Sequence, residues 1–393
     1  MQKNEGKHVN DRYRIIKQVG EGLLTEVYQV EDQRSNQIYA MKVIALQHQN
    51  DSRKAKKLKL MNLHIQQFQQ EFKREAKFLR NFNHPHIIKM VHSKMRNDSL
   101  KNGSSDDENC SSGRRPKSGE SRKSNNSNSS GSSSGRDEPG GERSEFDQYI
   151  VLEYADNGDL FDFTVAFQEP LGEDISRFYF HQILSAVEYL HLDQKIIHRD
   201  LKLENVLVDS LFNLKICDFT LAKTVSEGSV VGVFYSHCGT ERYMAPEILE
   251  GKPYKGNTTD IFALGVILFC MVTGVMPFYQ KATKEDPLYS LIYKNDEKGY
   301  WETLHKTYQN QPCFNTNLSD DFRKFIWSFF GYHYFERITL DRIKIQKWFL
   351  GYDPLISREN VIKEMARRKQ ILEDRYKNNP AIAQQRIKNL RIN

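Results

Sequence analysis

Residues 196–208 read IIHRDLKLENVLV, a charged loop enclosed by two short apolar runs. A turn at 209–210 leads to a third run, residues 214–217, which ends in Asp218-Phe219. This pattern predicts a strand, a polar loop and a β-hairpin that delivers an acidic residue. So many polar groups between buried segments cost solvation energy unless each has a partner. The stretch therefore indicates a functional site more strongly than a set of independent salt bridges.

The loop has the spacing His-Arg-Asp-x-x-x-x-Asn, and Asp-Phe follows after the hairpin. The sequence thus resembles the catalytic loop and the magnesium loop of eukaryotic protein kinases. Lys202 gives the loop its serine/threonine form, and the chain looks nearest the calcium/calmodulin-dependent and energy-sensing branch. The resemblance implies a bilobal α+β fold: a small antiparallel β-sheet lobe with one regulatory helix, and a larger, mainly helical lobe.

The resemblance also implies a role for each polar residue of the loop. Asp200 would orient a substrate hydroxyl and accept its proton, while Lys202 would stabilise charge on the transferring phosphoryl group. Asn205 and Asp218 would hold Mg²⁺, which prefers hard oxygen ligands. The implied reaction is transfer of the γ-phosphoryl group of ATP to serine or threonine hydroxyls of protein substrates.

Residues nearer the N-terminus supply the candidates for ATP binding. Short strands are expected at 13–16 and 27–30, around a turn whose glycines let backbone N–H groups approach phosphate. The family has a third glycine where this chain has Thr25. The resemblance assigns ATP binding to these residues: Val19, Gly20, Gly22, Val27, Ala40, Lys42, Glu75, Glu153, Ala155, Asp159 and Leu207.

Residues 39–44 alternate as a strand that carries Lys42, and a helix is predicted after it. The helical stripe consists of Ile65, Phe68, Phe72, Glu75 and Leu79. A carboxylate in an apolar stripe needs a cationic partner, and Lys42 is the candidate. In kinases such a pair holds the α- and β-phosphates.

Composition divides the 393-residue chain. We expect an N-terminal extension (1–12), a kinase domain (13–349) and a basic tail (350–393). The domain would consist of a small lobe (13–152), a hinge (153–155) and a large lobe (156–349). Residues 97–145 are nearly devoid of apolar side chains and predict a disordered insertion. The basic residues 47–61 predict a solvated helical extension, with a nuclear-import or partner-binding patch as the alternative.

The activation segment is expected at 218–247. By resemblance, Ser236 stands where many kinases carry an activating phosphate, added by an upstream kinase, and Arg199 would pair with it. An unmodified surface serine is the alternative. Thr240, in the substrate loop, would reach back to Asp200, and Arg337 would pair with Glu247.

Thr220 departs from the family, which has glycine after Asp-Phe. A β-branched residue restricts the backbone, so we predict a magnesium loop biased toward the active conformation. Thr25 and Thr220 also motivate an alternative function, a pseudokinase scaffold that binds nucleotide without efficient transfer. The joint retention of Lys42, Glu75 and the catalytic-loop residues argues against it.

A net charge of +6 favours neither a nucleic-acid nor a membrane partner. Five scattered cysteines without metal spacing suit reduced thiols, no signal peptide opens the chain, and both indicate an intracellular, cytoplasmic protein, with the nucleus as an alternative. The apolar run 261–272 is too short to span a bilayer and predicts a buried helix. His84 and His86 are interpreted as structural.

The tail is expected to be solvated and partly disordered. The alternative is an autoinhibitory helix, or one that binds a calmodulin-like partner, in which Val361, Ile362, Met365 and Leu372 dock on the large lobe. Glu204 and Asp159 suggest substrates with basic residues before the phosphorylated position, although Cys270 stands where strongly basophilic kinases have another acid.

Overall fold

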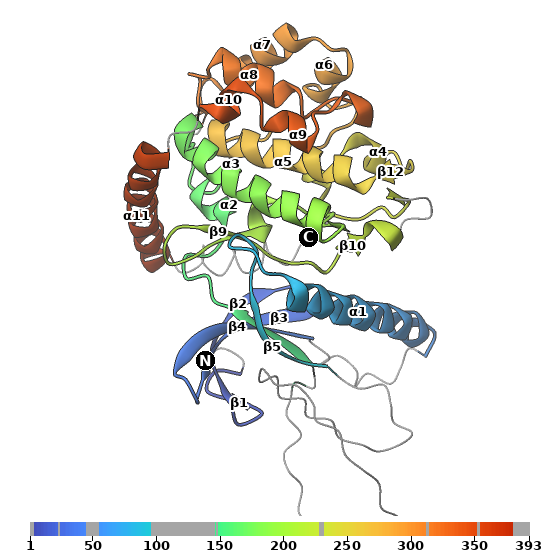
Figure 1. The fold of residues 1–393 in the computed structure, drawn as a ribbon, viewed down its shortest axis with the longest axis vertical. Coiled ribbons are helices and arrows are strands. Elements are labelled where there is room, and N and C mark those ends of the chain that lie inside the picture. The colour runs from blue at the N-terminus through green and yellow to red at the C-terminus, as the bar shows by residue number, and fades with distance from the viewer. Residues whose placement is uncertain are drawn as a thin grey trace, which may run out of the picture.

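The computed structural model describes residues 4–22, 24–44, 55–95, 146, 148–227, 232–311, 314–351 and 354–379, with backbone alone for 55–65 and 354–357. A small lobe built on one sheet lies against a larger helical lobe, and the C-terminal helix lies along one side of the larger lobe (Figure 1). This arrangement confirms the expected bilobal α+β architecture. The proposed insertion, 97–145, lies outside the described residues.

The small lobe is a six-stranded antiparallel sheet in the order β1-β2-β3-β4-β6-β5. Its strands are β1 (His8–Val9), β2 (Tyr13–Glu21), β3 (Thr25–Asp32), β4 (Gln37–Ile44), β5 (Met90–Lys94) and β6 (Tyr149–Glu153). The first two expected strands are thus longer than the sequence indicated. Residues set apart as an extension contribute β1, and Val9 is buried in the core of this lobe together with Tyr13 and Tyr28.

Helix α1 (Ala55–Asn81) connects the sheet to the large lobe. Phe72, Glu75 and Leu79 are buried and Phe68 is partly buried, as the helical stripe predicts. The side chain of Ile65 and those of the basic stretch 55–61 lie outside the described residues. The helix nevertheless begins at Ala55, so its backbone includes the second half of that stretch.

The large lobe is organised around α5 (Gly256–Thr273), whose residues from Thr259 to Thr273 are all buried. Around it lie α2 (Leu160–Phe163), α3 (Gly172–Glu188), α4 (Pro246–Leu249), α6 (Tyr289–Tyr293), α7 (Glu297–Tyr308), α8 (Asp320–Trp327), α9 (Leu340–Ile343) and α10 (Lys347–Leu350). Helix α5 is longer than expected: among the described helices, it alone is long and apolar enough to cross a membrane. Because 89% of it is buried inside the protein, it serves as the core helix that the sequence predicted.

Six short strands lie between α3 and α5 along the chain. They are β7 (Ile196–Ile197), β8 (Val206–Val208), β9 (Leu214–Ile216), β10 (Lys223–Thr224), β11 (Val233–Phe234) and β12 (Tyr254–Lys255). They form three two-stranded sheets, β7 with β10, β8 with β9, and β11 with β12. The β8–β9 pair is the predicted hairpin that separates the two motifs.

The tail forms helix α11 (Pro354–Asn378), which packs against α2 and α3. Val361, Met365 and Leu372 are buried in the main core, whereas Ile362 is 43% exposed. The expectation of a solvated tail is therefore wrong for residues 354–379, and the docking expected of Ile362 does not occur. An apolar face recurring at helical spacing outweighed the basic composition of this segment.

Candidate active site

The catalytic loop follows β7, and one carboxylate of α5, that of Asp260, holds its backbone in place. Asp260 accepts hydrogen bonds from the backbone N–H groups of His198 and Arg199, both at 2.9 Å, and contacts His191 Nε2 at 2.8 Å. Burial acts to raise the pKa of Asp260, but the hydrogen bond and charge of His191 outweigh it and lower the pKa overall. Helix α5 thus anchors the catalytic loop.

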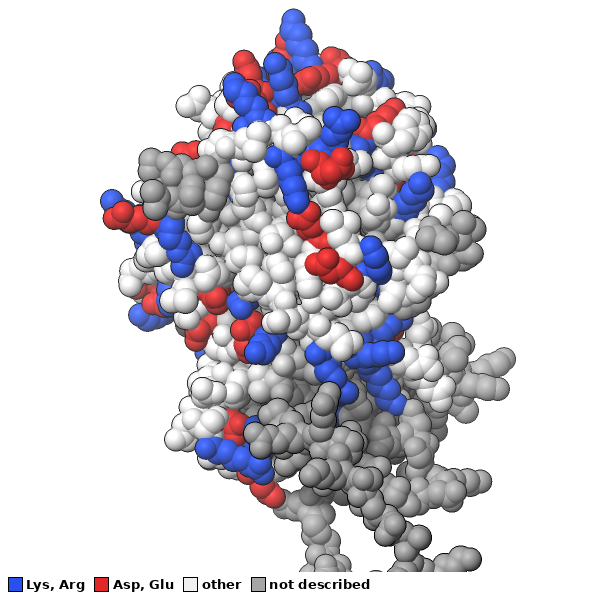
Figure 2. All heavy atoms as spheres, viewed as in Figure 1, with Lys and Arg blue, Asp and Glu red and all other residues white. Residues whose placement is uncertain are grey.

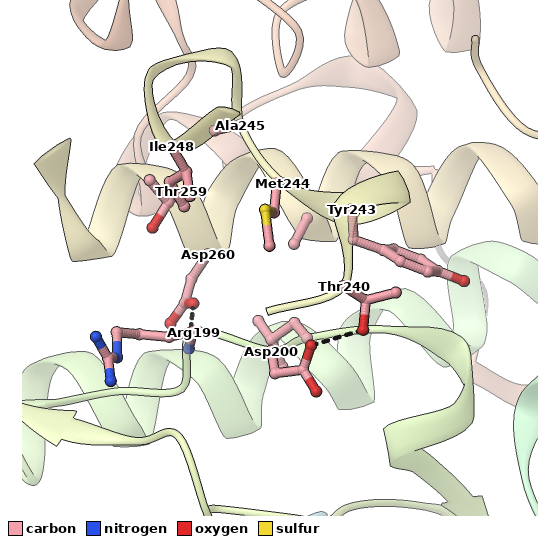
Figure 3. A pocket seen from close by; sticks show the side chains of 11 residues that line it. Arg199, Asp200, Thr240, Tyr243, Met244, Ala245, Ile248, Thr259 and Asp260 are labelled. Atoms are coloured by element: carbon pink, nitrogen blue, oxygen red, sulfur yellow. Dashed lines mark hydrogen bonds between the residues drawn. The ribbon is translucent and has the colours of Figure 1, made fainter. Parts of the chain in front are cut away.

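The carboxylate of Asp200 is held by three side chains, of which Figure 3 shows Thr240. Thr240 Oγ1 donates to Oδ1 at 2.9 Å, and Asn205 Nδ2 donates to Oδ2 at 3.1 Å. Lys202 Nζ lies 3.2 Å from Oδ2 and donates to Thr240 Oγ1 at 2.9 Å. The predicted contact between Thr240 and Asp200 is present, and these bonds fix the orientation of the Asp200 carboxylate.

Gly239 allows the substrate loop to approach the catalytic loop. Its φ is +111°, and a Cβ at this position would lie 2.8 Å from the Arg199 carbonyl oxygen. The small cavity between the two loops, shown in Figure 3, measures about 20 Å³. A space of this size holds about one water molecule, so this cavity is too small for a nucleotide.

Lys42 on β4 and Glu75 on α1 form the predicted ion pair. Lys42 Nζ lies 2.9 Å from Oε1 and 2.8 Å from Oε2 of Glu75, and both residues are buried. Burial acts to lower the pKa of Lys42, but the neighbouring carboxylates of Asp218 and Glu75 raise it above its ordinary value. Lys42 therefore stays charged.

Asp218 completes this cluster from the end of the β8–β9 hairpin. Its Oδ1 lies 3.0 Å from Lys42 Nζ, its side chain is 41% exposed, and its φ of 60° turns the chain sharply. Burial would raise the pKa of Asp218, but Lys42 and the Thr220 hydroxyl lower it overall, so the carboxylate is ionised. The backbone N–H of Cys217 donates to the Asn205 carbonyl at 2.9 Å. This bond keeps the two predicted Mg²⁺ ligands, Asn205 and Asp218, close together in space.

The donor set fits Mg²⁺ rather than a transition metal. No group of three or more His, Cys, Asp or Glu residues that could hold a metal occurs among the described residues. Asn205 directs its amide nitrogen to the Asp200 carbonyl at 2.8 Å, which leaves the amide oxygen as its free ligand atom. Two hard oxygen donors leave room for water and ATP phosphates, as Mg²⁺ requires.

Thr220 takes part in the cluster through its hydroxyl, a role that the sequence analysis did not predict. Thr220 Oγ1 lies 2.7 Å from Asp218 Oδ1, 3.0 Å from Glu75 Oε2 and 2.9 Å from Lys42 Nζ. Phe219 is fully buried between Phe82 and His198, with ring centroids at 4.9 Å in both cases. The magnesium loop thus holds Phe219 inside the core, as in the active conformation. The bias toward that conformation stays a prediction.

Several nucleotide-binding candidates lie on neighbouring strands of the sheet. Gly20 pairs with Val27 across β2 and β3, and Val27 in turn pairs with Lys42 across β3 and β4. The Gly22 N–H donates to the Thr25 carbonyl at 2.8 Å and closes the turn. A Cβ on Gly22 would lie 2.6 Å from Thr25 Oγ1, so the departure at Thr25 is accommodated by the neighbouring glycine.

The other proposed ATP-binding residues come from both lobes. Ala40 pairs with Leu152 across β4 and β6, and Val19 lies half-buried on β2. In the large lobe, Asp159 caps α2 by accepting from the Asp162 N–H at 3.1 Å and forms a β-bridge with Leu207. Ala155 is buried at the hinge between them.

Glu153 links the lobes through its side chain, a contact that the sequence did not indicate. Its Oε1 accepts from the Lys89 N–H at 2.9 Å in the small lobe and lies 3.0 Å from Lys215 Nζ on β9. The Glu153 N–H donates to the Lys89 carbonyl at 2.9 Å. Such a contact joins residues more than sixty positions apart, and no local pattern signals it.

The activation segment places Ser236 beside Arg199. Arg199 Nη1 donates to Ser236 Oγ at 2.6 Å, and its Nε donates to the Leu221 carbonyl at 2.7 Å. Ser236 is exposed while Arg199 is buried. The structure therefore brings together the predicted regulatory serine and its cation.

One further predicted contact lies outside the cleft, as do the two histidines that were interpreted as structural. Arg337 forms a bidentate pair with Glu247, at 2.7 Å and 2.6 Å, in a buried position. His84 lies 3.1 Å from Ser185 Oγ, and His86 Nδ1 lies 3.0 Å from the Leu214 carbonyl. Burial lowers the pKa of both histidines. Both therefore have the structural role that was expected.

Comparison with known proteins gives a family match over most of the chain. The protein kinase domain matches residues 13–101 and 142–349. CBL-interacting protein kinase 11 of Oryza sativa subsp. japonica is 29% identical over 338 residues, 86% of this chain and 51% of that protein. NUAK family SNF1-like kinase 2 of Homo sapiens is 46% identical over 129 residues, 33% of this chain and 20% of that protein.

The carbon catabolite-derepressing protein kinase of Secale cereale is 36% identical over 203 residues, 52% of this chain and 36% of that protein. The chain thus spans about half the length, or less, of these curated relatives.

Proposed function

Because this chain belongs to the protein kinase family, within its calcium/calmodulin-dependent and energy-sensing serine/threonine branch, we propose that it transfers the γ-phosphoryl group of ATP to serine or threonine hydroxyls of protein substrates. One observation carries the proposal: Asp200 is oriented by Thr240 and Asn205 while the Lys42–Glu75 pair is already formed. A scaffold has no need of both arrangements at once.

In the proposed reaction, Asp200 accepts a hydrogen bond from the substrate hydroxyl and takes its proton during transfer. The hydroxyl oxygen forms a bond to the γ-phosphorus, the bond to the bridging oxygen breaks, and ADP leaves with that oxygen. Lys202 is bonded to Thr240 beside Asp200, where its charge stabilises the transferring phosphoryl group. The chemistry depends on positioning and electrostatics rather than on a covalent intermediate.

ATP would lie between the lobes, with Lys42 on its α- and β-phosphates. Val27, Ala40 and Leu207 would contact the purine. The carbonyl of Glu153 and the backbone of Ala155 would bind the adenine edge, since the Glu153 N–H is already bonded to Lys89. Asp218 and Asn205 would hold Mg²⁺, which supplies positive charge to the phosphate oxygens when bound.

Regulation is proposed at Ser236. A phosphate on this exposed serine would form charge-assisted bonds with Arg199, whose position beside Asp200 links the segment to the catalytic loop. Ser236→Ala should then abolish activation by an upstream kinase while leaving the fold intact. The exposed Ser210 in the β8–β9 turn offers a control, Ser210→Ala. Unchanged activation of the Ser236 variant would indicate an unmodified surface serine.

Substrates with basic residues before the acceptor are proposed from Glu204 and Asp159. Burial raises the pKa of Glu204, and Tyr243 donates to its carboxylate at 3.3 Å. A basic residue of the substrate would pair with this carboxylate and favour its charged form. Cys270, which replaces a further acid, is buried. We therefore expect a moderate basic preference rather than a strict one.

The remaining expectations concern partners and location. The calmodulin-like partner of the tail is the weaker proposal, because Val361, Met365 and Leu372 already bury the apolar face of α11. An intracellular, cytoplasmic location, with the nucleus as alternative, is supported by free thiols at Cys217, Cys238 and Cys270. Figure 2 shows basic and acidic side chains intermingled over one face of the large lobe, which favours no nucleic-acid or membrane partner.

The test is transfer from labelled ATP to a generic basic protein. The intact chain is compared with Asp200→Asn and Lys42→Met, each checked by thermal unfolding because Lys42 is buried. Removal of one preorganised electrostatic group typically costs 2.7–4 kcal/mol, about 10²–10³ in rate. Loss of transfer in both folded variants would support the kinase. Absence of transfer from the intact chain, with ATP bound and Ser236 phosphorylated, would favour the pseudokinase scaffold.

A further inference from the structure

The hydroxyl of Thr220 contacts three charged groups at the centre of the cleft. Glu75 comes from α1, Lys42 from β4 and Asp218 from the loop itself, and all three lie within 3.0 Å of Thr220 Oγ1. A glycine at this position, as in the family pattern, has no atom that could make these contacts. The network thus depends on the threonine that this chain has in place of the family's glycine.

Hydrogen-bond accounting fixes what the hydroxyl does. A threonine hydroxyl has one proton and two lone pairs, whereas a lysine ammonium only donates. Lys42 therefore donates to Thr220 Oγ1, and the hydroxyl proton goes to a carboxylate. Asp218 Oδ1, at 2.7 Å, is nearer than Glu75 Oε2, at 3.0 Å. Asp218 Oδ1 thus accepts from both Thr220 and Lys42, which leaves Oδ2 as the atom available to a metal.

Backbone contacts tie the same loop to α1. Arg74 Nη2 donates to the Thr220 carbonyl at 3.2 Å, and the Phe219 N–H donates to Glu75 Oε1 at 3.2 Å. Among the described residues, positive φ is found at Asp218 but not at Thr220. The backbone at Thr220 is therefore compatible with a β-branched residue. Because β-branched side chains have few χ1 rotamers, the hydroxyl has a restricted orientation.

We propose that Thr220 is a positioning residue that joins α1 to the magnesium loop and presents the Asp218 carboxylate to Mg²⁺·ATP in a fixed orientation. Formation of the Lys42–Glu75 pair and orientation of Asp218 then become one event, because the same hydroxyl contacts all three. The role rests on the proposed function, since Mg²⁺·ATP is the ligand that Asp218 would meet.

The test measures nucleotide affinity, which does not require transfer. The dissociation constant of ATP is measured by titration calorimetry on the full chain, with Mg²⁺ and with EDTA, for the intact protein, Thr220→Val and Thr220→Ser. Valine keeps the shape and removes the hydroxyl, while serine keeps the hydroxyl. A charge-assisted hydrogen bond contributes about 1.5–3 kcal/mol, so Thr220→Val should weaken binding in Mg²⁺ by about tenfold or more.

The same substitution should change affinity in EDTA by less than about twofold, and Thr220→Ser should restore the Mg²⁺ value. Equal affinities of the valine variant and the intact chain in Mg²⁺, or equal losses with and without Mg²⁺, would overturn the proposal. A purely structural role would instead lower thermal stability and both affinities together.

The outcomes separate this inference from the proposed function. If the intact chain transfers phosphate but Thr220→Val binds Mg²⁺·ATP normally, the inference alone fails. If the intact chain binds Mg²⁺·ATP through Thr220 but never transfers phosphate, the proposed function alone fails. Binding by the intact chain that is unaffected by Mg²⁺ would overturn both.

Discussion

At the scale of single residues, Gly239 combines a positive φ with a close backbone neighbour. Its φ is positive, and a Cβ added here would lie only 2.8 Å from the Arg199 carbonyl oxygen, so there is no room for a side chain. Gly239→Ala should push the substrate loop away from Asp200 and break the Thr240 contact. Strain of this kind costs about 1–3 kcal/mol, and we expect transfer to fall by at least about tenfold.

Gly251→Ala is the matched control for this prediction. Gly251 also has positive φ, at +65°, but nothing lies within 4 Å of its Cβ position. Backbone strain is common to both variants, whereas the clash belongs to Gly239 alone. Transfer rates measured at matched stability should therefore differ, and equal rates in the two variants would show that the close approach does not matter.

Single residues also show how far the sequence predicts the site. The contact Lys42–Glu75 was predicted from the helical stripe, and Thr240–Asp200 and Arg337–Glu247 were predicted from the family resemblance. The structure contains each of them. Thr220 was interpreted through its backbone alone, because a motif comparison registers a missing glycine and not a new hydroxyl. Its position two residues after Asp218 was the available signal, but the third partner, Glu75, is 145 residues away.

At the scale of elements, α11 differs from the prediction made for it. The basic residues of the tail indicated a solvated segment, yet several of them are packed against the large lobe. Arg368 is 2% exposed and donates to the carbonyls of Phe163, Glu169 and Pro170 at 2.7–2.8 Å. Its guanidinium also lies 4.5 Å from the centre of the Phe167 ring. Charge counts do not reveal which cations find backbone acceptors, because those acceptors belong to a loop about 200 residues earlier.

Replacement of Arg368 should therefore destabilise the protein. Arg368→Met keeps the length and apolar stem but leaves three carbonyls without this donor, while Glu364 keeps its hydrogen bonds from Arg367. An unsatisfied buried polar group costs about 1–3 kcal/mol, so we expect the free energy of unfolding in urea to fall by about 3 kcal/mol or more. Arg367→Met is the control, because the side chain of Arg367 is 43% exposed. Similar losses in the two variants would contradict the structural role of Arg368.

The same helix predicts a dependence on pH. Hydrogen bonds from Arg367 lower the pKa of Glu364 below its ordinary value of 4.5, despite an opposing effect of burial. A lowered folded-state pKa means that the stabilisation is complete above pH 4.5 and is lost as the pH falls through the folded-state value. The stability difference between the intact chain and Glu364→Gln, measured by urea unfolding, should therefore be largest near pH 6 and shrink below 4.5. A difference that grows on acidification would contradict this assignment.

At the scale of the whole molecule, the family resemblance predicted the two lobes but not all that is attached to them. Strand β1 extends the small-lobe sheet, and α11 extends the large-lobe core. Both lie beyond the first and last motif residues that carry the resemblance, so no motif spacing could place them. Between the lobes, Glu153 and Lys215 form a contact across the hinge, and Lys42 reaches Asp218 across the cleft. The lobes are thus held together by two charged contacts, one at the hinge and one across the cleft.

These contacts make one arrangement of the lobes and the magnesium loop more stable than its alternatives. A flipped loop would expose Phe219, which is fully buried against Phe82 and His198, and would break the contacts of Thr220 with Glu75 and Lys42. A ligand that binds only the flipped state has its affinity reduced by the fraction of molecules in that state. For a state populated at about 1–10%, the reduction is about 10- to 100-fold.

Type-II inhibitors, which require the flipped loop, should therefore bind the intact chain about 10- to 100-fold more weakly than type-I inhibitors with the same hinge-binding group. Thr220→Gly removes both the hydroxyl and the β-branch, so it should strengthen type-II binding while leaving type-I binding nearly unchanged. Calorimetric dissociation constants for one matched pair of inhibitors, measured on both proteins, give the comparison. Tight type-II binding to the intact chain would mean that the loop flips freely, and the contacts of Thr220 would then not govern the conformation of the cleft.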